Sequence, residues 1–471
     1  MKYITLLFFA LTLSACKVDD LDDKIKDEFK NYANPPSEVY SNEDEPARTL
    51  PANPAGCPAW AKNSVNHITE SMRLPEGCKY DRVKIVINNQ SNIVFDCNGA
   101  QFNGLDKEFR QKPGTTYKVG REPIDIGILI RSTENYQSNN ITVKNCNLKN
   151  YVRGIRVNFY MSAATVSDLK NNINVKALEN HLRTLSPTNI RVEHSTINFS
   201  HKDGVYVDRF VNGFVLDSSS INSTGVVGLY LDSGSTNNHI KNSSFTKNGY
   251  SRYVSELRAI TKELADYSRE GIAIDSSFNN RIEGNTFANN SRGSVFIYKN
   301  CNEFHKNPNQ IPRYQSADGN IITGNNFDDE DVGVWIASRQ SEDLRDFECG
   351  IPKVATGIKY YGPYGRTTYF YEDYAKNNQV LNNEFKNIRF GVIVEDDGNT
   401  ITGNTFTGSA NTNIKVGTKY RTEKLSNPVK NTTIKSNHFN SSAATTNRIL
   451  LRYSPVNTVI SGNTPADVNI K

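Results

Sequence analysis

The amino-acid sequence predicts an all-β solenoid, a parallel β-helix of about ten coils with short helical and loop insertions. Two repeated patterns predict this fold. In the first, Asn and an Ile or Val lead through a short alternating run to another Asn and often a Phe, as in residues 320–327 and 399–406. In the second, Gly is followed by alternating apolar residues, as in residues 204–208 and 228–232. Alternation with a period of two predicts strands.

The spacing of the glycines supports coils rather than larger repeats. Gly204 and Gly228 lie 24 residues apart, and Gly271 and Gly293 lie 22 apart. Such a unit holds two or three short strands with their turns, but no strand-helix-strand unit, and so fits one coil of a parallel β-helix. A propeller, the alternative, needs longer units. The chain has 59 Asn, nearly twice its 30 Gly. Asn tolerates left-handed turns, which predicts frequent, regular turns.

The amino terminus has the pattern of an export signal. One Lys, an apolar run over residues 4–13 and then small residues precede Cys16. The run has the length of a signal peptide rather than of a membrane span. The stretch Leu13-Ser14-Ala15-Cys16 resembles the bacterial lipobox, which implies a lipoprotein signal peptide over residues 1–15 and lipidation of Cys16. Because Lys17, not Asp, follows Cys16, the resemblance also implies an outer-membrane lipoprotein that faces the periplasm or the cell surface. An ordinary cleaved secretion signal is the alternative.

Charge divides the remaining chain. Residues 17–48 carry ten acidic and five basic residues with few apolar groups, which predicts an acidic, disordered tether over residues 16–48. We expect an N-terminal cap over residues 49–90 and the β-helix domain over residues 91–471. The net charge of the whole chain is +5, but from residue 49 onward 49 basic residues face 40 acidic ones. This balance suits an acidic polymer. We expect no nucleic-acid partner, because the positive charge is spread out and the protein is exported, and we expect a monomer.

Six cysteines remain once Cys16 is set aside, and in an exported protein an even number favours disulfides. Six cysteines allow 15 pairings. Proximity in the sequence favours three pairs, Cys57 with Cys78, Cys97 with Cys146, and Cys301 with Cys349. A metal site is the weaker interpretation, because no two cysteines have the Cys-x-x-Cys spacing of zinc sites.

Three longer gaps between repeats indicate insertions. Residues 159–186 and 251–268 have helical patterns, and residues 338–376 are rich in Tyr. Insertions in repeat proteins cluster on the binding face.

Residues 85–465 resemble the right-handed parallel β-helix proteins of the pectate lyase-like superfamily, specifically the group with carbohydrate-binding and sugar-hydrolase repeats and the mannuronan C5-epimerase modules. The Asn-x-Ile-x-x-Asn-x-Phe and Gly-x-x-x-Asp coils carry this resemblance. Residues 202–208 occupy the place of the Gly-x-Asp-Pro-His element of alginate epimerases, but Asp-Pro-His is missing. Asp203 also resembles the Asp of the polygalacturonase Asn-Thr-Asp-Gly element, whose Asp-Asp and Gly-His-Gly partners are absent. The calcium motifs of pectate lyases are not evident.

Alternation within each Gly strand turns the first and third residues after Gly inward and the second and fourth outward. Adjacent coils are about 4.8 Å apart, so Tyr206 should lie beside Tyr230, and Asp208 beside Asp232 and one further coil from Asp275. The predicted catalytic residues lie on or next to these columns: His201, Lys202, Asp203, Tyr206, Asp208, Tyr230, Asp232 and Asp275. The predicted substrate-binding residues are Arg131, Arg153, Arg156, Arg269 and Trp335.

These columns suit a linear acidic sugar polymer. Tyr and Trp faces stack on pyranose rings, and Arg binds carboxylates. Clustered Asp groups raise one another's proton affinity, and a bound Ca²⁺ would relieve their repulsion, although no metal ligands and no certain cofactor are assigned. A solvated sheet face, with the Asp groups capping turns, is the alternative.

Two kinds of reaction fit the predicted site. A lyase or C5-epimerase must neutralise the uronate carboxylate, for which Arg156 or Arg153 is suited, and then remove the C5 proton. Lys202, His201 or Tyr206 would be the base and Tyr230 the acid. Hydrolysis instead needs two carboxylates, about 5 Å apart for retention or roughly 6.5–9.5 Å for inversion, which the Asp column also offers. We therefore expect a membrane-anchored enzyme acting on a uronate-containing polysaccharide, with a non-catalytic carbohydrate-binding or adhesive lipoprotein as the rival.

Overall fold

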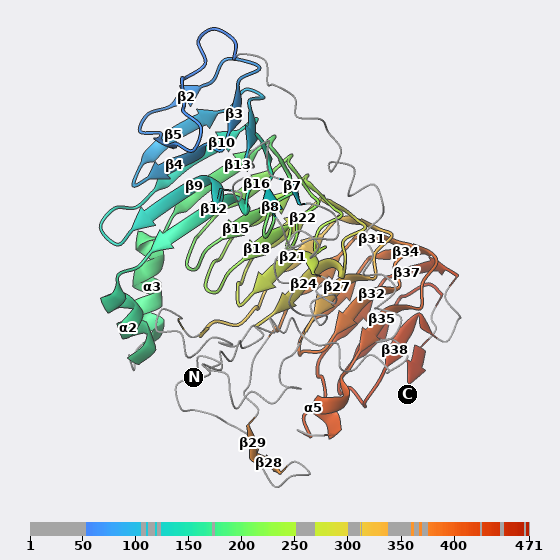
Figure 1. Cartoon of the computed structure of the whole chain (residues 1–471). Coiled ribbons are helices and arrows are strands. Elements are labelled where there is room, and N and C mark those ends of the chain that lie inside the picture. The colour runs from blue at the N-terminus through green and yellow to red at the C-terminus, as the bar shows by residue number, and fades with distance from the viewer. Residues whose placement is uncertain are drawn as a thin grey trace, which may run out of the picture.

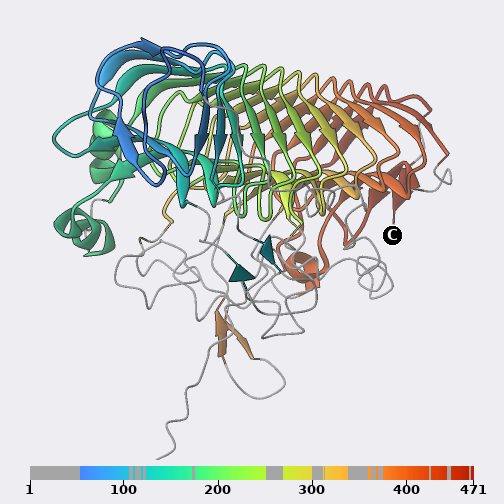
Figure 2. The same cartoon turned by 45° about the horizontal axis from the view of Figure 1, so that its top comes forward.

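A computed structural model describes residues 53–104, 124–171, 175–250, 269–299, 311, 313–337, 375–423, 426–442 and 447–465, together with short strands at 110–111, 118–119, 359–361, 367–369 and 468–470. The described chain winds into a solenoid whose coils stack one behind the next (Figures 1 and 2). Its strands form three long sheets, here called A, B and C, in which neighbouring strands run parallel. The predicted right-handed parallel β-helix is confirmed.

Sheet A has 13 strands among the described residues, which is a few more coils than the ten expected. In order, these are β1 (Val65–His67), β4 (Lys84–Asn88), β9 (Ile126–Thr133), β12 (Arg153–Tyr160), β15 (Val205–Val207), β18 (Leu229–Leu231), β21 (Glu270–Asp275), β24 (Gly293–Tyr298), β27 (Val332–Ile336), β32 (Phe390–Val394), β35 (Thr412–Val416), β38 (Ile449–Leu451) and β40 (Val468–Ile470).

Sheet B follows sheet A around each coil. Its strands are β2 (Met72–Arg73), β5 (Ser91–Asp96), β10 (Asn139–Lys144), β13 (Thr188–Glu193), β16 (Val215–Asp217), β19 (His239–Lys241), β22 (Arg281–Glu283), β25 (Ile321–Thr323), β30 (Gln379–Leu381), β33 (Thr400–Thr402), β36 (Thr433–Lys435) and β39 (Val459–Ser461).

Sheet C completes the coil. Its strands are β3 (Lys79–Asp81), β6 (Gln101–Asn103), β11 (Asn147–Lys149), β14 (Thr196–Asn198), β17 (Ser220–Asn222), β20 (Ser244–Thr246), β23 (Thr286–Ala288), β26 (Asn326–Asp328), β31 (Glu384–Lys386), β34 (Thr405–Gly408) and β37 (His438–Ser441). Two antiparallel ribbons lie outside the three sheets: β7 (Arg110–Gln111) with β8 (Lys118–Val119), and β28 (Lys359–Tyr361) with β29 (Thr367–Tyr369).

The structure differs from the expected organisation in two details. Strands β1 to β4 already pair within the three sheets, so the coils begin before residue 91, inside the segment expected to be a cap. The 22-residue spacing of Gly271 and Gly293 is not the coil register. Ile272 pairs with Val295, so this coil is 23 residues long, and Gly293 pairs with Glu270 instead. A glycine pattern shows that a coil exists, but hydrogen bonding fixes its register.

Columns of equivalent side chains fill the interior. The middle residues of the sheet C strands point inward, and in the later coils they form a continuous stack of phenylalanine rings. Successive ring centroids lie between 4.7 and 5.3 Å apart along Phe245, Phe287, Phe327, Phe385, Phe406 and Phe439. Each inward residue therefore packs on its equivalents in the neighbouring coils, as repeat proteins require.

A second column lies at the bend between sheets B and C. From Asn285 to Asn463 it is a ladder of buried asparagines. The side-chain oxygen of Asn325, for example, accepts hydrogen bonds from the backbone and side-chain nitrogens of Asn285, while its own amide donates to Asn383. Toward the amino terminus the same positions hold Ser243, Ser219 and Ser195. The Asn surplus of the sequence thus satisfies buried backbone groups at the turns.

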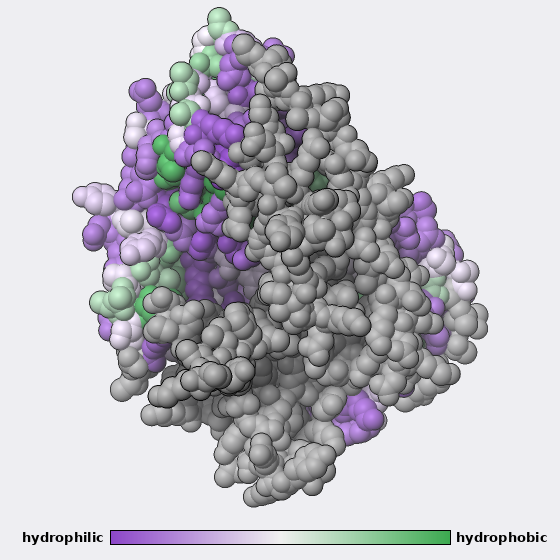
Figure 3. All heavy atoms as spheres, viewed as in Figure 1, coloured by the Kyte–Doolittle hydropathy of each residue, from purple (hydrophilic) through white to green (hydrophobic). Residues whose placement is uncertain are grey.

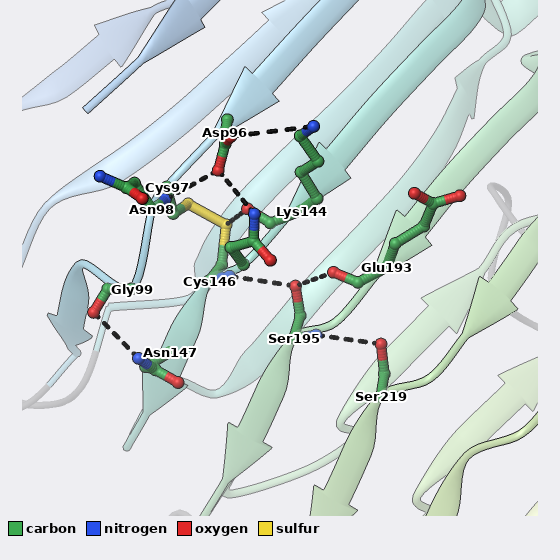
Figure 4. Close-up of a disulfide and its surroundings, with 11 residues drawn as sticks. Asp96, Cys97, Asn98, Gly99, Lys144, Cys146, Asn147, Glu193, Ser195 and Ser219 are labelled. Atoms are coloured by element: carbon green, nitrogen blue, oxygen red, sulfur yellow. Dashed lines mark hydrogen bonds and ion pairs between the residues drawn. A yellow bond between two sulfur atoms is a disulfide. The ribbon is translucent and has the colours of Figure 1, made fainter. Parts of the chain in front are cut away.

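This column ends in a disulfide. Cys97 and Cys146 are bonded to each other on neighbouring coils, and the backbone nitrogen of Cys146 donates to Ser195 Oγ (Figure 4). Cys57 is bonded to Cys78. Both bonds match the predicted pairs. The third predicted pair, Cys301 with Cys349, lies outside the described residues.

Helices lie on one flank of the solenoid (Figure 2). The predicted helical insertion at 159–186 contains α2 (Ala163–Asn171) and α3 (Val175–Leu185). A short helix, α5 (Lys419–Glu423), lies near the carboxyl end. The predicted insertion at 251–268, most of the Tyr-rich segment 338–376 and the amino-terminal signal with Cys16 lie outside the described residues. Within the described part of the chain, no helix is both long and apolar enough to cross a membrane.

Candidate functional site

The outward face of sheet A carries the two predicted columns. The strand register places Arg156, Tyr206 and Tyr230 side by side on successive coils. It continues through Ala273 and Phe296 to Trp335. Phe296 was missed in the sequence because its coil carries one extra residue after Gly293. The predicted order of the other residues is confirmed.

Tyr206 and Tyr230 form a flat pair. Their ring centroids lie 5.0 Å apart and their planes differ by 3°. Each hydroxyl donates a hydrogen bond to an acid one coil further along. Tyr206 donates to Asp232 over 2.9 Å, and Tyr230 donates to Asp275.

The acid column is much less accessible than expected. Asp208 and Asp232 are 6% and 7% exposed, and Asp275 is fully buried. The alternative of a solvated sheet face therefore does not apply to these three acids. An outward position on the sheet is not a surface position here. Arg313 packs against Asp232 and Asp275, and Arg156 and Asn158 contact Asp208.

Guanidinium groups balance the charge of the acid column. Arg156 binds Asp208 through two hydrogen bonds, Nε to Oδ1 at 3.1 Å and Nη2 to Oδ2 at 2.9 Å. Asn158 also donates to Asp208 and in turn accepts a 2.7 Å hydrogen bond from Arg131 Nε. The two hydrogen bonds from Arg156 to Asp208 form a bidentate pair, which is the stronger form of the Arg-carboxylate contact.

Two further arginines complete this arrangement, and neither was predicted from the repeat pattern. Arg313 Nη2 lies 3.2 Å from Asp232 Oδ1, and its Nε lies 3.2 Å from Asp275 Oδ2. Arg209 Nε lies 3.7 Å from Asp232 Oδ2. Arg313 is far from the column in sequence and carries no repeat signal, so only the folded chain shows the contact.

These contacts set the protonation of the acids. Burial alone would raise the pKa of Asp232, but the neighbouring Arg313 and Arg209 outweigh it and hold the pKa below its usual range. Burial raises the pKa of Asp208 despite its bonds to Arg156. Burial, with Asp232 and Asp275 close by, raises the pKa values of the Tyr206 and Tyr230 hydroxyls well above 10. Tyr206 is therefore not suited to act as a base at neutral pH.

Within the amino-terminal part of the face, the accessible residues lie on β12, on β15 and in the turn before β15, whereas Val86 and Leu129 on the preceding coils are 7% and 3% exposed. Arg153, Arg156 and Tyr206 are half-buried, and Lys202 is exposed. The Arg153 and Arg156 guanidinium carbons lie 5.1 and 5.6 Å from the Tyr206 ring centroid, within cation-π distance. Arg153 Nε also lies 2.9 Å from Asp203 Oδ2, which connects β12 to the turn that carries Lys202. Seen from the direction of Figure 1, the described surface here is largely hydrophilic (Figure 3).

The remaining predicted residues fall into different places. His201 is half-buried beside Lys202, and Arg131 is half-buried next to Asn158. Arg269 and Trp335 are 7% and 3% exposed. Arg269 pairs with Glu270 over 3.4 Å, and Trp335 packs edge-on against Phe296. The structure thus brings Arg153, Arg156 and Tyr206 together at an accessible site but places Arg269 and Trp335 in a buried layer.

A calcium ion does not fit the acid column. The two contacts of Arg313 with Asp232 and Asp275 and the paired contacts of Arg156 with Asp208 place guanidinium groups on all three acids. No cluster of three or more His, Cys, Asp or Glu side chains suited to a metal ion occurs among the described residues. Arginine side chains therefore compensate the stacked negative charge, the role that we considered for Ca²⁺ from the sequence.

Comparisons with known proteins agree with the fold. A family model described as a right handed beta helix region matches residues 180–342. No curated protein sequence matches the chain. A periplasmic alginate epimerase structure is 11% identical, with a TM-score of 0.48, and the match covers 87% of this chain and 77% of that one.

Two other solved structures are also similar to this chain. The A-module of a mannuronan C-5 epimerase from Azotobacter vinelandii is 10% identical, with a TM-score of 0.41 and coverage of 83% and 88%. A surface protein and adhesin of Streptococcus pneumoniae is 11% identical, with a TM-score of 0.44 and coverage of 86% and 91%. At this identity the likeness concerns the fold, and the function must be argued from the residues of this chain.

Proposed function

We propose that this protein binds an anionic, uronate-containing polysaccharide at the amino-terminal part of the outward face of sheet A. One observation carries the proposal: the half-buried guanidinium groups of Arg153 and Arg156 flank the half-buried ring of Tyr206. The accessible edge of the aromatic ring offers an apolar contact for a pyranose ring, and the guanidinium groups beside it offer charged hydrogen bonds to a sugar carboxylate. Exposed Lys202 adds positive charge at the same place.

Lyase or C5-epimerase chemistry is the reaction we propose for this site. Arg153 or Arg156 would neutralise the uronate carboxylate, which makes the C5 proton more acidic. Of the bases considered, Lys202 is exposed and His201 lies beside it, whereas the raised pKa of the Tyr206 hydroxyl removes it from this role. A lyase would release an unsaturated uronate that absorbs ultraviolet light, and an epimerase would release no such product.

Binding without catalysis is the second candidate, and the acid column favours it. Asp208, Asp232 and Asp275 are buried, and each has an arginine within 3.2 Å of a carboxylate oxygen. A glycosidase needs one carboxyl group free to give a proton and another free to attack or to activate water. These acids are engaged by arginine instead, so hydrolysis by paired Asp residues is the least favoured activity.

One experiment separates these functions. The purified protein is incubated with polygalacturonate, alginate and a neutral glucan, and binding, ultraviolet-absorbing product and reducing ends are measured. Retention on the two acidic polymers with new ultraviolet absorbance supports a lyase. Retention without absorbance but with a changed uronate composition of the recovered alginate supports an epimerase, and retention alone supports a binding protein. Release of reducing ends without absorbance would favour hydrolysis. Equal binding to the neutral glucan would refute recognition of uronate.

The anchoring of the protein is also a proposal. The lipobox-like Leu13-Ser14-Ala15-Cys16 and the acidic segment behind it support attachment to the outer membrane through a lipid on Cys16. Detergent phase partitioning of the full chain and of a Cys16→Ala variant tests this. We expect the full chain in the detergent phase and the variant in the aqueous phase, whereas unchanged partitioning would rule out lipidation.

A further inference from the structure

Arg313 contacts two neighbouring coils of the acid column at once. Its Nη2 lies 3.2 Å from Asp232 Oδ1, and its Nε lies 3.2 Å from Asp275 Oδ2. Its side chain is 9% exposed. The register of β18 and β21 makes the two acids equivalent residues of adjacent coils. A single guanidinium group thus contacts a stacked pair of carboxylates and offsets part of their charge, and Arg209 lies beside Asp232 as a second positive group.

The same two acids hold the tyrosine pair. Asp232 accepts the hydrogen bond of Tyr206, and Asp275 accepts that of Tyr230. The two rings lie parallel, 5.0 Å apart. Arg313 therefore contacts the hydrogen-bond acceptor of each tyrosine. Its own side chain is buried and is not part of the accessible site that contains Arg153.

The position of Arg313 depends on the helical insertion. Ile311 belongs to a buried cluster with Phe159, Leu169, Leu182 and Phe210, three of which are contributed by β12 and the two helices. The Tyr314 hydroxyl donates a 2.7 Å hydrogen bond to the carbonyl of Leu169 in α2. Gln315 donates to Glu179 in α3. Residues on both sides of Arg313 are thus fixed to β12, α2 and α3.

We propose that Arg313 is a positioning residue for sugar binding. Together with Arg209 it balances the charge of Asp232 and Asp275 and keeps both acids as acceptors for Tyr206 and Tyr230. It thereby holds the stacked pair of rings in place beside Arg153 and Arg156, where an anionic polysaccharide binds. The proposal rests on the proposed function. It adds that the helical insertion, through Arg313, determines the shape of the aromatic part of the site.

A purely structural role makes a different prediction. If Arg313 only offsets buried charge, its loss lowers stability without changing how Tyr206 is presented to a ligand. If it positions the tyrosine pair, its loss changes affinity in a way that depends on the protonation of the acids. The titratable groups that face Asp232 are Arg313, Arg209 and Tyr206, with Asp208 and Asp275 on the adjacent coils. Without Arg313, only Arg209 remains as a positive partner among these groups.

The test compares the wild-type protein with R313A and R313K, using polygalacturonate oligosaccharides as the probe. We expect R313A to bind at least tenfold more weakly at pH 8 and to recover toward pH 5, because protonation of one acid removes the repulsion between the two. The wild-type affinity should change little over this range. Guanidinium ion at millimolar concentration should restore part of the affinity of R313A. R313K should be intermediate, because an ammonium group lacks the planar fork.

Controls keep the outcomes separate. Arg191, on the outer face of sheet B, pairs with Glu193, so R191Q removes an arginine without touching sheet A and should bind normally.

Near-ultraviolet circular dichroism of ligand-free R313A and R313K reports the tyrosine environment and needs no polysaccharide. If R313A does not fold, R313K supplies both readouts. Wild-type affinity of a folded variant with an unchanged spectrum would overturn the positioning role. A wild-type protein that fails to bind would instead overturn the proposed function, and the spectrum would still decide whether Arg313 holds the tyrosines.

Discussion

Tyr206 on β15 and Tyr230 on β18 lie face to face, 5.0 Å apart, and each donates its hydroxyl to an acid on the following coil. The spacing follows from the distance between parallel strands of adjacent coils. The hydrogen bonds fix the rings from one end, while Arg153 and Arg156 lie at the free side of Tyr206. A regular coil thereby turns two residues 24 positions apart into one aromatic surface beside positive charge.

Replacing Tyr206 separates stacking from hydrogen bonding. Tyr206→Ala removes the ring and should weaken polyuronate binding by about fivefold, in line with about 1 kcal/mol for an aromatic contact. Tyr206→Phe removes only the bond to Asp232 and should have a smaller effect. Tyr136→Ala, which removes an exposed tyrosine in the turn after β9, is the matched control. Equal affinity of all four proteins in a titration would show that the ring does not touch the ligand.

Glu330 gives a prediction about pH. Its buried carboxyl accepts hydrogen bonds from the backbone and side-chain nitrogens of Asn290. Asparagine side chains accept the same two hydrogen bonds in the ladder that runs from Asn285 to Asn463. Burial raises its pKa well above 4.5. Because the folded-state pKa lies above the unfolded value, the ionised group destabilises the fold increasingly as pH rises above about 4.5, and protonation at lower pH removes this effect.

Glu330→Gln should therefore raise the Tm at pH 8 while changing it little at pH 4. The amide keeps an acceptor oxygen for Asn290 but carries no charge. Thermal unfolding followed by circular dichroism over this pH range provides the check. A variant that is less stable than the wild type at pH 8 would show that the charge of Glu330 is favourable in place.

The disulfide between Cys97 and Cys146 should stabilise the first coils. It closes a loop with a sequence separation of 49 residues, for which loop entropy corresponds to about 2–4 kcal/mol. Replacing both cysteines with Ser keeps a small polar residue in the column that continues through Ser195. We expect earlier unfolding in urea for this variant, and reduction should shift the wild type toward it. Identical curves for oxidised and reduced wild type would contradict a stabilising role.

The asparagine ladder should be sensitive to a single change. Asn325 is 1% exposed and makes hydrogen bonds to Asn285, Asn383 and the Ile282 carbonyl. Asn325→Ala leaves the Asn285 backbone nitrogen buried without its acceptor, and should lower the unfolding free energy by about 2–4 kcal/mol. Asn457→Ala, at an exposed turn position, should cost far less. A similar loss in the two variants would mean that the ladder is not a special source of stability.

The repeat made most of the fold predictable. Each coil carries its own Gly and Asn signals, and equivalent residues must stack, so the order of Arg156, Tyr206 and Tyr230 followed from spacing alone. The same reasoning failed where one residue was added, as at Gly293, because periodicity does not show which residue lies outside the register. The two described disulfides followed from proximity because each joins segments that the winding brings together.

The site was less predictable for a physical reason. Alternation shows which face of the sheet a side chain is on, but it does not show what covers that face. Asp232 and Asp275 point outward as predicted, yet Arg313 packs against them from a segment with no repeat pattern. Burial and charge pairing then determine which acids titrate and which side chains a ligand can reach. These properties depend on contacts between repeats and insertions, and the repeat pattern carries no record of them.

The most direct test of the account is the affinity of the protein for polygalacturonate, measured for the wild type and for an Arg153→Gln, Arg156→Gln double variant at low and high salt. We predict that the double variant loses at least tenfold in affinity at low salt, because two charged contacts are removed, and that its salt dependence becomes shallower. Binding of both proteins to a neutral glucan should stay weak. An affinity of the folded double variant equal to that of the wild type would contradict the central claim that these arginines recognise an acidic sugar polymer.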